Sequence, residues 1–254
     1  MLAIALVAST LTLFSGFGLG TLLLPAFALV FPLDVAIAAT AFVHLANNVS
    51  KVFLVGRGAD WATVWRFGLP AALAALVGGS LLFALKPDAL WTYELSGTRS
   101  VTALGLVLGL LIIVFALFDL LPALRKLTVH SRFLVPGGLL SGFFGGLSGH
   151  QGALRSIFLG KLGLDAKAFI ATGTLCAILV DGSRLAVYST RYARNADAIT
   201  AAGGWGLIAG AIVMAGLGAV LGARLLPKVT MESLRLFVGA LLVVVGGLVA
   251  AGLV

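Results

Sequence analysis

The composition of the chain is that of a membrane protein. It has 254 residues, of which 61% are hydrophobic and only 10% are charged, whereas a soluble domain is roughly half apolar and a quarter charged. The 17 Lys and Arg residues outnumber 9 acidic ones, but they are scattered between apolar runs. This pattern is typical of basic loops beside anionic lipid and is not evidence for nucleic-acid binding, so no nucleic-acid partner is expected. The single cysteine, Cys176, excludes an intrachain disulfide, and the apolar start argues against a cleaved signal peptide.

Eight apolar segments approach the roughly 20 residues that a membrane-spanning helix needs. They cover residues 2–31, 35–55, 65–85, 101–121, 133–159, 166–188, 200–221 and 233–254. The longest connections, residues 86–100 and 122–132, are too short to fold alone. Four tryptophans lie near segment ends, where interfacial aromatic residues are expected: Trp61, Trp65, Trp91 and Trp205. We therefore predict an all-α polytopic membrane protein.

Two of the segments carry glycine-rich stretches that predict interrupted helices. The fifth contains residues 140–155 (LSGFFGGLSGHQGALR), with five glycines from Gly142 to Gly152, and each glycine costs a helix about 1 kcal/mol relative to alanine. The first contains residues 15–20 (SGFGLG), followed by Pro25. As a straight helix at about 1.5 Å per residue, the first segment would overshoot a bilayer core of about 30 Å. Each of the two segments is therefore predicted to consist of two half-helices.

The two glycine-rich segments belong to an internal duplication. An offset of 132 residues aligns Gly20 with Gly152 and Ala39-Thr40 with Ala171-Thr172. At an offset of 133, residues 48–51 (NVSK) fall on residues 181–184 (DGSR). We predict two repeats within one membrane domain, residues 1–122 and 133–254, each with one broken segment and three plain spans. Internal repeats built on broken helices are a known plan of transporters.

The distribution of Lys and Arg predicts that the repeats are inverted. If all eight segments cross, the two sides of the membrane carry nine and eight cations, without bias. If segments one and five are re-entrant hairpins that do not cross, the sides carry twelve and five, in agreement with the positive-inside rule. We therefore expect both termini outside. The twelve are Lys51, Arg57, Arg66, Arg125, Lys126, Arg132, Arg155, Lys161, Lys167, Arg224, Lys228 and Arg235.

These features together resemble the sulfite exporter TauE/SafE family, also called the toluene sulfonate uptake permease family, over essentially the whole chain. The resemblance is carried by residues 15–20 leading to Pro25, the glycines from Gly142 to Gly152, and the Ala-Thr pair that recurs in each half. The close of each half also matches, at Gly78-Gly79 and at residues 218–224 (GAVLGAR). The resemblance implies transport of small sulfur-containing anions, such as sulfite, sulfonates or sulfoacetate, across the cytoplasmic (inner) membrane. The sequence departs from the family in having His150-Gln151 among the glycines and no proline before Arg155, which leaves the substrate open.

Polar side chains in the fifth segment are candidates for binding the anion, because ionisable groups at membrane depth are costly and mark function. Arg155, about one turn into the second half-helix, can hold a sulfite or sulfonate through two parallel hydrogen bonds. The alternative is that its side chain extends to the membrane interface. Gln151 and His150 are candidate donors to the anion, and His150 could instead carry a coupled proton or bind a backbone carbonyl in a loop.

The glycine breaks are predicted to supply further donors. Half-helix N-termini offer free N–H groups and a partial positive charge to an anion, and glycine lets the backbone approach a ligand closely. If the repeats are inverted, the two tips face each other. Gly18, Gly20, Gly149 and Gly152 are therefore candidate substrate-binding residues.

Polar residues end the second segment and occupy the matching place in the sixth. Asn47 and Asn48 are candidate donors to the anion, or they form interhelical hydrogen bonds. Lys51 and Arg184 are candidate counter-charges, although both are more readily placed at the membrane interface. Asp181 either pairs with Arg184 three residues on, which is the simpler interpretation, or takes up a proton as a coupling residue.

Other signals are weaker. The hydroxyls of Thr40 and Thr172 lie at matched depth and could contact substrate, although hydrogen bonding to their own helix is the commoner use. His44 is interpreted as a core histidine, and a position facing the transport pathway is the less favoured alternative. Several glycines, including the Gly105-x-x-x-Gly109 pair, are spaced for close helix packing.

The leading hypothesis is a secondary transporter of a small sulfur-containing anion that works by alternating access. An anion channel is the alternative. An intramembrane enzyme is disfavoured because its nearest nucleophile and base, Ser148 and His150, are i, i+2 neighbours that do not face each other on a helix. No ATPase loop and no metal-binding cluster are present, so no cofactor is expected. The expected partners are the anion and the lipid bilayer. The direction of transport, the coupling ion and the oligomeric state, a homodimer included, stay open.

Overall fold

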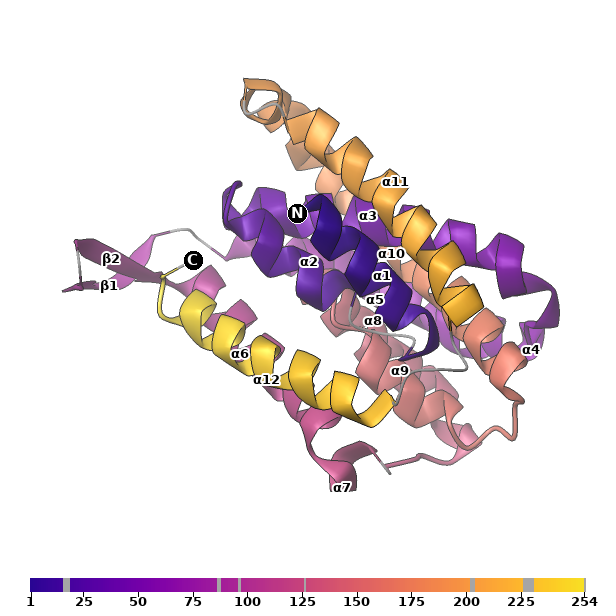
Figure 1. The fold of residues 1–254 in the computed structure, drawn as a ribbon. Helices are drawn as coiled ribbons and strands as arrows, with labels where there is room; N and C mark the ends of the chain where they lie inside the picture. Colours follow the sequence, from indigo (N-terminus) through magenta and orange to yellow (C-terminus); the bar gives the residue numbers. More distant parts are fainter. Residues whose placement is uncertain are drawn as a thin grey trace.

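The computed structural model describes residues 1–15, 19–85, 88–95, 97–125, 127–201, 204–225 and 231–253, and these form a helical bundle with one small β-hairpin (Figure 1). The long helices are α1 (Leu2–Ser15), α2 (Leu19–Ala28), α3 (Leu33–Val55), α5 (Leu69–Ala84), α6 (Ala103–Leu120), α8 (Leu134–Ser148), α9 (Gly152–Leu159), α10 (Ala166–Ala201), α11 (Gly204–Leu225) and α12 (Met231–Ala250). Short turns of helix connect them: η1 (Gly56–Gly58), α4 (Trp61–Thr63), the π-helical η2 (Val64–Gly68), α7 (Pro122–Arg125) and η3 (Ser131–Phe133).

Each of the eight predicted apolar segments contains at least one helix, although residues 101–102 belong to strand β2 and residues 149–151 separate α8 from α9. Within the described residues, three helical stretches are long and apolar enough to cross a membrane: Trp61–Ala84, Ala166–Thr190 and Gly204–Gly222. Ala103–Phe118 and Gly239–Ala250 are shorter apolar helices. The sixth segment was predicted to end at Tyr188, but α10 continues to Ala201. The sequence from 189 to 201 has no glycine or proline, so the helix extends past its apolar part.

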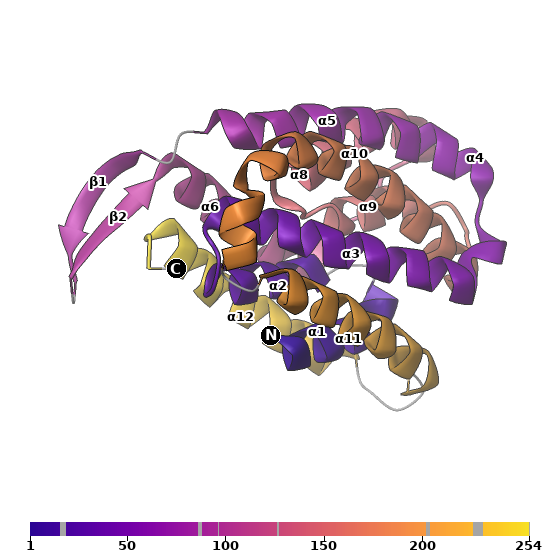
Figure 2. The same ribbon diagram turned by 90° about the horizontal axis from the view of Figure 1, so that it is seen from above.

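Helices α3 and α10 run side by side through the middle of the bundle (Figure 2). Around them, α1 packs along α11, α5 packs along α8, and α6 packs along α12. Figure 1 shows the α6–α12 pair as a distinct flank of the molecule. The middle of α3 is almost wholly buried and forms the centre of the larger apolar core.

Glycines make the close contacts between these helices. Three glycines of α8, spaced four residues apart, lie against the backbone of η2 and α5. Gly138 lies against Phe67, Gly142 against Ala71 and Gly146 against Ala75, and a methyl group at any of the three would overlap that backbone. Gly218 and Gly222 of α11 lie in the same way against α1, and Gly109 of α6 lies against α12, as predicted for Gly109. Gly142 and Gly146, which belong to the stretch that predicted an interruption, therefore lie inside a continuous helix and serve close packing.

The connection after α5 folds into a β-hairpin, which the all-α prediction missed. Strands β1 (Ala89–Glu94) and β2 (Thr98–Thr102) pair in antiparallel fashion, with Gly97 at a φ of 111° in the turn. The strands contain β-branched and aromatic residues, which favour extended backbone. The hairpin projects from one end of the bundle (Figure 2), and the Tyr93 hydroxyl donates to the carbonyl of Ala251 at 2.8 Å. Contact with the end of the chain thus supports a segment too short to be stable alone.

Candidate functional site

The fifth segment is interrupted at a single glycine. Helix α8 ends at Ser148, and Gly149 takes a φ of 81°, a left-handed conformation that favours glycine. Helix α9 starts at Gly152, and the Ser141 hydroxyl donates to the carbonyl of Gln151 at 3.0 Å. The predicted break is therefore present but narrower than the glycine-rich stretch suggested.

The two interrupted segments meet inside the bundle. In the first segment, α1 ends at Ser15 and α2 begins at Leu19; Gly18, a predicted site residue, lies outside the described residues. A Cβ atom added to Gly20 would lie 3.9 Å from the Gly149 carbonyl oxygen and 3.8 Å from the His44 ring. Gly20 and Gly149 therefore lie close together. Their part in binding stays a prediction.

Asp181 of α10 gathers hydrogen bonds from three parts of the bundle. Its carboxylate is fully buried. Oδ2 accepts from His44 Nδ1 at 2.6 Å and from Asn48 Nδ2 at 3.0 Å, both on α3. Oδ1 accepts from Gln151 Nε2 at 3.2 Å and from Arg184 Nε and Nη2 at 3.1 and 2.8 Å. Asp181 therefore links α3, α10 and the break between α8 and α9.

The predicted ion pair between Asp181 and Arg184 is confirmed. The expectation that Arg184 lies at the membrane interface is wrong, because its side chain is only 1% exposed and is held by the buried carboxylate. A buried arginine needs such a partner to offset the loss of hydration. The pair also leaves Arg184 largely compensated, so its charge is less available to a ligand.

Gln151 connects this carboxylate to Arg155. Its amide nitrogen donates to Asp181, and its amide oxygen accepts from Arg155 Nη1 at 3.4 Å. Arg155 is 5% exposed and lies one turn into α9, as the half-helix interpretation predicts, and it does not extend to an interface. The guanidinium is thus positioned by the chain's own polar groups.

Lys51 is also buried, with 5% of its surface exposed, so its predicted interfacial position is wrong. The reason is a hydrogen-bonded shell from α1, α3 and α11. With its amide oxygen turned toward Lys51, Asn47 accepts from Nζ at 3.1 Å and donates to Ser9 Oγ at 2.7 Å and to the Ala215 carbonyl at 3.2 Å. The opposite orientation would place the Asn47 amide oxygen beside the Ala215 carbonyl oxygen, where neither can donate. We therefore adopt the orientation with the amide oxygen toward Lys51. Asn47 therefore positions Lys51.

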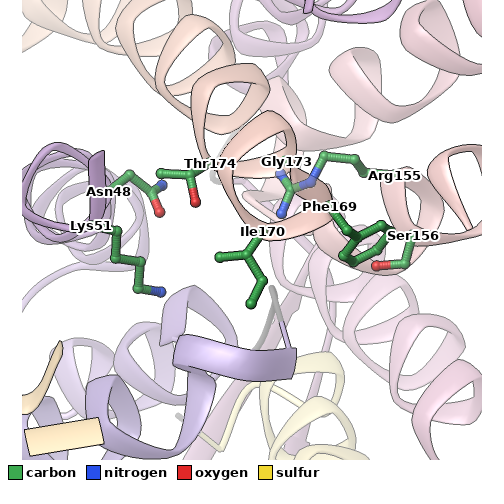
Figure 3. A pocket seen from close by; sticks show the side chains of 8 residues that line it. All are labelled: Asn48, Lys51, Arg155, Ser156, Phe169, Ile170, Gly173 and Thr174. Carbon is green, nitrogen blue, oxygen red and sulfur yellow. The ribbon is translucent and has the colours of Figure 1, made fainter. Parts of the chain in front are cut away.

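Lys51 and Arg155 face a common pocket (Figure 3). It holds about 350 Å³ of empty space, its open side included, and is lined by Asn48, Lys51, Arg155, Ser156, Phe169, Ile170, Gly173 and Thr174. Figure 3 shows the lysine and the arginine entering from opposite sides, with the Asn48 amide and the Thr174 hydroxyl on the rim near Lys51. None of these eight lining residues is acidic. Two cations with nearby hydrogen-bond donors can replace the hydration of a small anion.

Three of the predicted residues, Asn48, Lys51 and Arg155, line this pocket. Gln151, Asp181 and Arg184 lie behind it in the hydrogen-bonded network. The hydroxyl of Thr172 instead accepts from the backbone N–H of Asp60 at 2.9 Å. Thr40 is buried beside Gly20. Gly152 begins α9 but does not line the pocket. The roles of Thr40, Thr172 and Gly152 in binding stay predictions.

His150 stacks on Phe115 of α6, with ring centroids 5.8 Å apart and planes within 1°. Its Nδ1 lies 3.1 Å from Ser148 Oγ, so the argument that these two side chains cannot meet is wrong: the helix ends at Ser148 and helical spacing no longer applies. The Ser148 hydroxyl donates to the Phe144 carbonyl, which leaves Nδ1 as the donor to the serine. A serine held in this way is not activated as a nucleophile.

Sequence reasoning missed the role of His44, which it treated as a core histidine. Its position carried a usable signal: His44, Asn48 and Lys51 are spaced by four and three residues, which places them on one face of α3. Three polar side chains on one face of an otherwise apolar helix predict a shared environment. Thr174 and Ser156 were also missed, because a single hydroxyl in an apolar helix carries no such pattern.

The apolar helices and the buried, positively charged pocket between them define a polytopic membrane protein. Residues 1–249 match the family described as Sulfite exporter TauE/SafE, and the chain belongs to this family. Its members are transporters of sulfite and related sulfur anions, so the resemblance found in the sequence is confirmed. Searches among curated proteins and among solved structures gave no match.

Proposed function

We propose that this protein is a secondary transporter that carries a small sulfur-containing anion across the cytoplasmic (inner) membrane by alternating access. The observation that carries the proposal is the pocket into which Lys51 and Arg155 both project. A carrier for a small anion needs a site that replaces water with fixed donors, and positive charge in a low-dielectric interior supplies most of the attraction. Family membership favours sulfite, a sulfonate or sulfoacetate as the passenger.

The shape of the pocket supports a compact anion. Lys51 and Arg155 provide charge from two sides, and the Asn48 amide and Thr174 hydroxyl can bond the remaining oxygens. Phe169 and Ile170 add an apolar wall that can face a sulfur lone pair or a short carbon chain. Two positive charges suit a dianion better than a zwitterion such as taurine, whose ammonium group would meet a cation.

We also propose that the two halves are inverted repeats that exchange access between the two sides. The packing supports this proposal. Under the repeat, α1 corresponds to α8 and α11 corresponds to α5, and α1 packs on α11 as α8 packs on α5. The repeat also matches α3 with α10 and α6 with α12, and the two helices of each of these pairs pack on each other. A two-fold relation of this kind would let equivalent contacts form whether the site opens to one side of the membrane or to the other.

The test is sulfite transport by the purified protein in proteoliposomes. Vesicles loaded with unlabelled sulfite should take up radiolabelled sulfite by exchange, at a rate that saturates and that sulfoacetate reduces by competition. Vesicles with Arg155→Ala should exchange at least tenfold more slowly. If folded wild-type protein moves none of the sulfite, sulfonate or sulfoacetate offered, the proposal is wrong. Single-channel currents would assign the protein to the channel alternative instead.

A further inference from the structure

Lys51 is a buried cation held by a neutral group. Among the described residues, the buried acidic and basic side chains are Lys51, Arg155, Arg184, Asp181, His44 and His150; the buried Cys176 and Tyr188 count as neutral. Asp181 is paired with Arg184, whereas Lys51 Nζ donates to the Asn47 amide oxygen. A cation held only by a neutral partner in a low-dielectric interior is costly. A bound anion would compensate the charge of Lys51, whereas without the anion the site must carry this charge or lose it before moving across the membrane.

Lys51 is the cation in this group that can lose its charge. Arginine stays protonated in proteins, whereas lysine releases its proton readily when it is buried. In the adopted amide orientation, Lys51 Nζ donates to the neutral Asn47 amide oxygen at 3.1 Å, and either a neutral amine or an ammonium can make this bond. Lys51 also lines the pocket, so its proton can exchange with water wherever the pocket is open.

We propose that Lys51 carries a proton that crosses the membrane together with the anion. This inference rests on the proposed transport function. On one side, water supplies the proton to Lys51 Nζ as the anion enters beside it. On the other side, the anion leaves, the proton returns to water, and the empty site reorients with one positive charge fewer.

The other titratable groups around Lys51 do not replace it in this role. Arg155 on α9 repels its charge, and Asp181 on α10 attracts it. Asp181 and Arg184 neutralise each other, and His44 is bonded to Asp181. His150 lies beyond the pocket lining, against Phe115. Helices α1 and α2 contain no ionisable side chain. Lys51 is the one group among them that both titrates and touches the pocket.

Calorimetry of sulfite binding in buffers of different protonation enthalpy tests the inference without transport. Wild-type protein at mildly alkaline pH should take up about one more proton per bound sulfite than Lys51→Arg does, because binding and protonation are linked. Sulfite has its own proton equilibrium, but this contributes equally to both proteins. Lys51→Gln, which is always neutral, should likewise lack the extra proton and should bind sulfite at least tenfold more weakly. An exposed-site change, Lys167→Arg, is the matched control and should behave as wild type.

Transport by the same variants gives a second readout. In vesicles, Lys51→Arg keeps the positive charge but changes its donors, so sulfite exchange should slow. The exchange that remains should no longer give the accumulation that an imposed pH gradient drives in the wild type. A folded Lys51→Arg or Lys51→Gln protein that still takes up the wild-type number of protons would overturn the inference while leaving anion transport intact. Wild-type protein that neither binds nor exchanges sulfite would instead remove the proposed function, and the inference with it.

Discussion

Replacement of Arg155 by alanine is the most direct test of where the anion binds. Arg155 is 5% exposed, and its side chain projects into the pocket opposite Lys51. Two charge-assisted hydrogen bonds to an anion, at about 1.5 kcal/mol each, amount to about 3 kcal/mol, which is roughly a 150-fold change in Kd. The substitution also removes the donor, Arg155 Nη1, to the Gln151 amide oxygen, which should add to the loss of affinity.

The assay is the sulfite-dependent rise in melting temperature of the detergent-purified protein. At a sulfite concentration near 100 times the wild-type Kd, mass action stabilises the protein by about 2.7 kcal/mol. With a Kd about 150-fold weaker, the same concentration gives only about 0.3 kcal/mol, so about nine-tenths of the thermal shift should disappear. The melting temperature without sulfite, recorded in the same series, separates lost binding from lost folding.

Two control variants sharpen this experiment. Arg66→Ala removes an exposed arginine that does not line the pocket and should keep the full shift. Arg155→Lys keeps the charge but loses the planar pair of donors, and should retain an intermediate shift. If Arg155→Ala keeps the wild-type shift in a folded protein, the anion does not bind between Lys51 and Arg155, and the reasoning from the pocket is refuted.

Three further predictions concern the framework of the site. Asp181→Asn should destabilise the protein by about 3–5 kcal/mol, because Arg184 is left as an uncompensated buried charge. Denaturation in detergent measures this loss. As a control, Asp88→Asn at an exposed position should change the stability little. Gly142→Ala should lower the melting temperature because its methyl group would overlap the Ala71 carbonyl across the α5–α8 contact, whereas Gly247→Ala, with open space around it, should be neutral or stabilising; equal effects would contradict the packing argument. Gly149→Ala should cost about 1–2 kcal/mol for a non-glycine residue at positive φ and should also displace Arg184 Nη1, so reduced sulfite exchange is expected together with lower stability.

The helical segments and several site residues followed from the sequence because they depend on local physics. Apolar runs of bilayer length form helices whatever their neighbours. Arg155 was identified as a site residue because a charge within such a run is costly and is usually kept for a function. The glycines were harder to interpret. Gly142 and Gly149 look alike in the sequence, yet one lies against a neighbouring helix and the other turns the chain. Only the position of α5 decides between packing and interruption, and that is tertiary information.

The burial of Lys51 and Arg184 could not be predicted for a related reason. Both lie near the ends of apolar stretches, where a long basic side chain usually reaches the interface. Their fate depends on residues far away in the chain: Asn47 is fixed by Ser9 and Ala215, and Arg184 faces a carboxylate that also binds His44. The hairpin after α5 was missed for a similar reason, because its support comes from the end of the chain.

A buried carboxylate beside the proposed anion site needs a physical explanation, because Asp181 would repel a bound anion. Its hydrogen bonds supply one. The carboxylate neutralises Arg184 and accepts hydrogen bonds from His44, Asn48 and Gln151. Asn48 lines the pocket directly, and Gln151 is hydrogen-bonded to Arg155, which lines it. Without Asp181, the buried Arg184 would lose its ion-pair partner. With it, the proposed attraction for an anion rests on Lys51 and Arg155, the two basic residues that line the pocket. The same carboxylate joins α3 to the break after α8, and Gln151 connects it to Arg155.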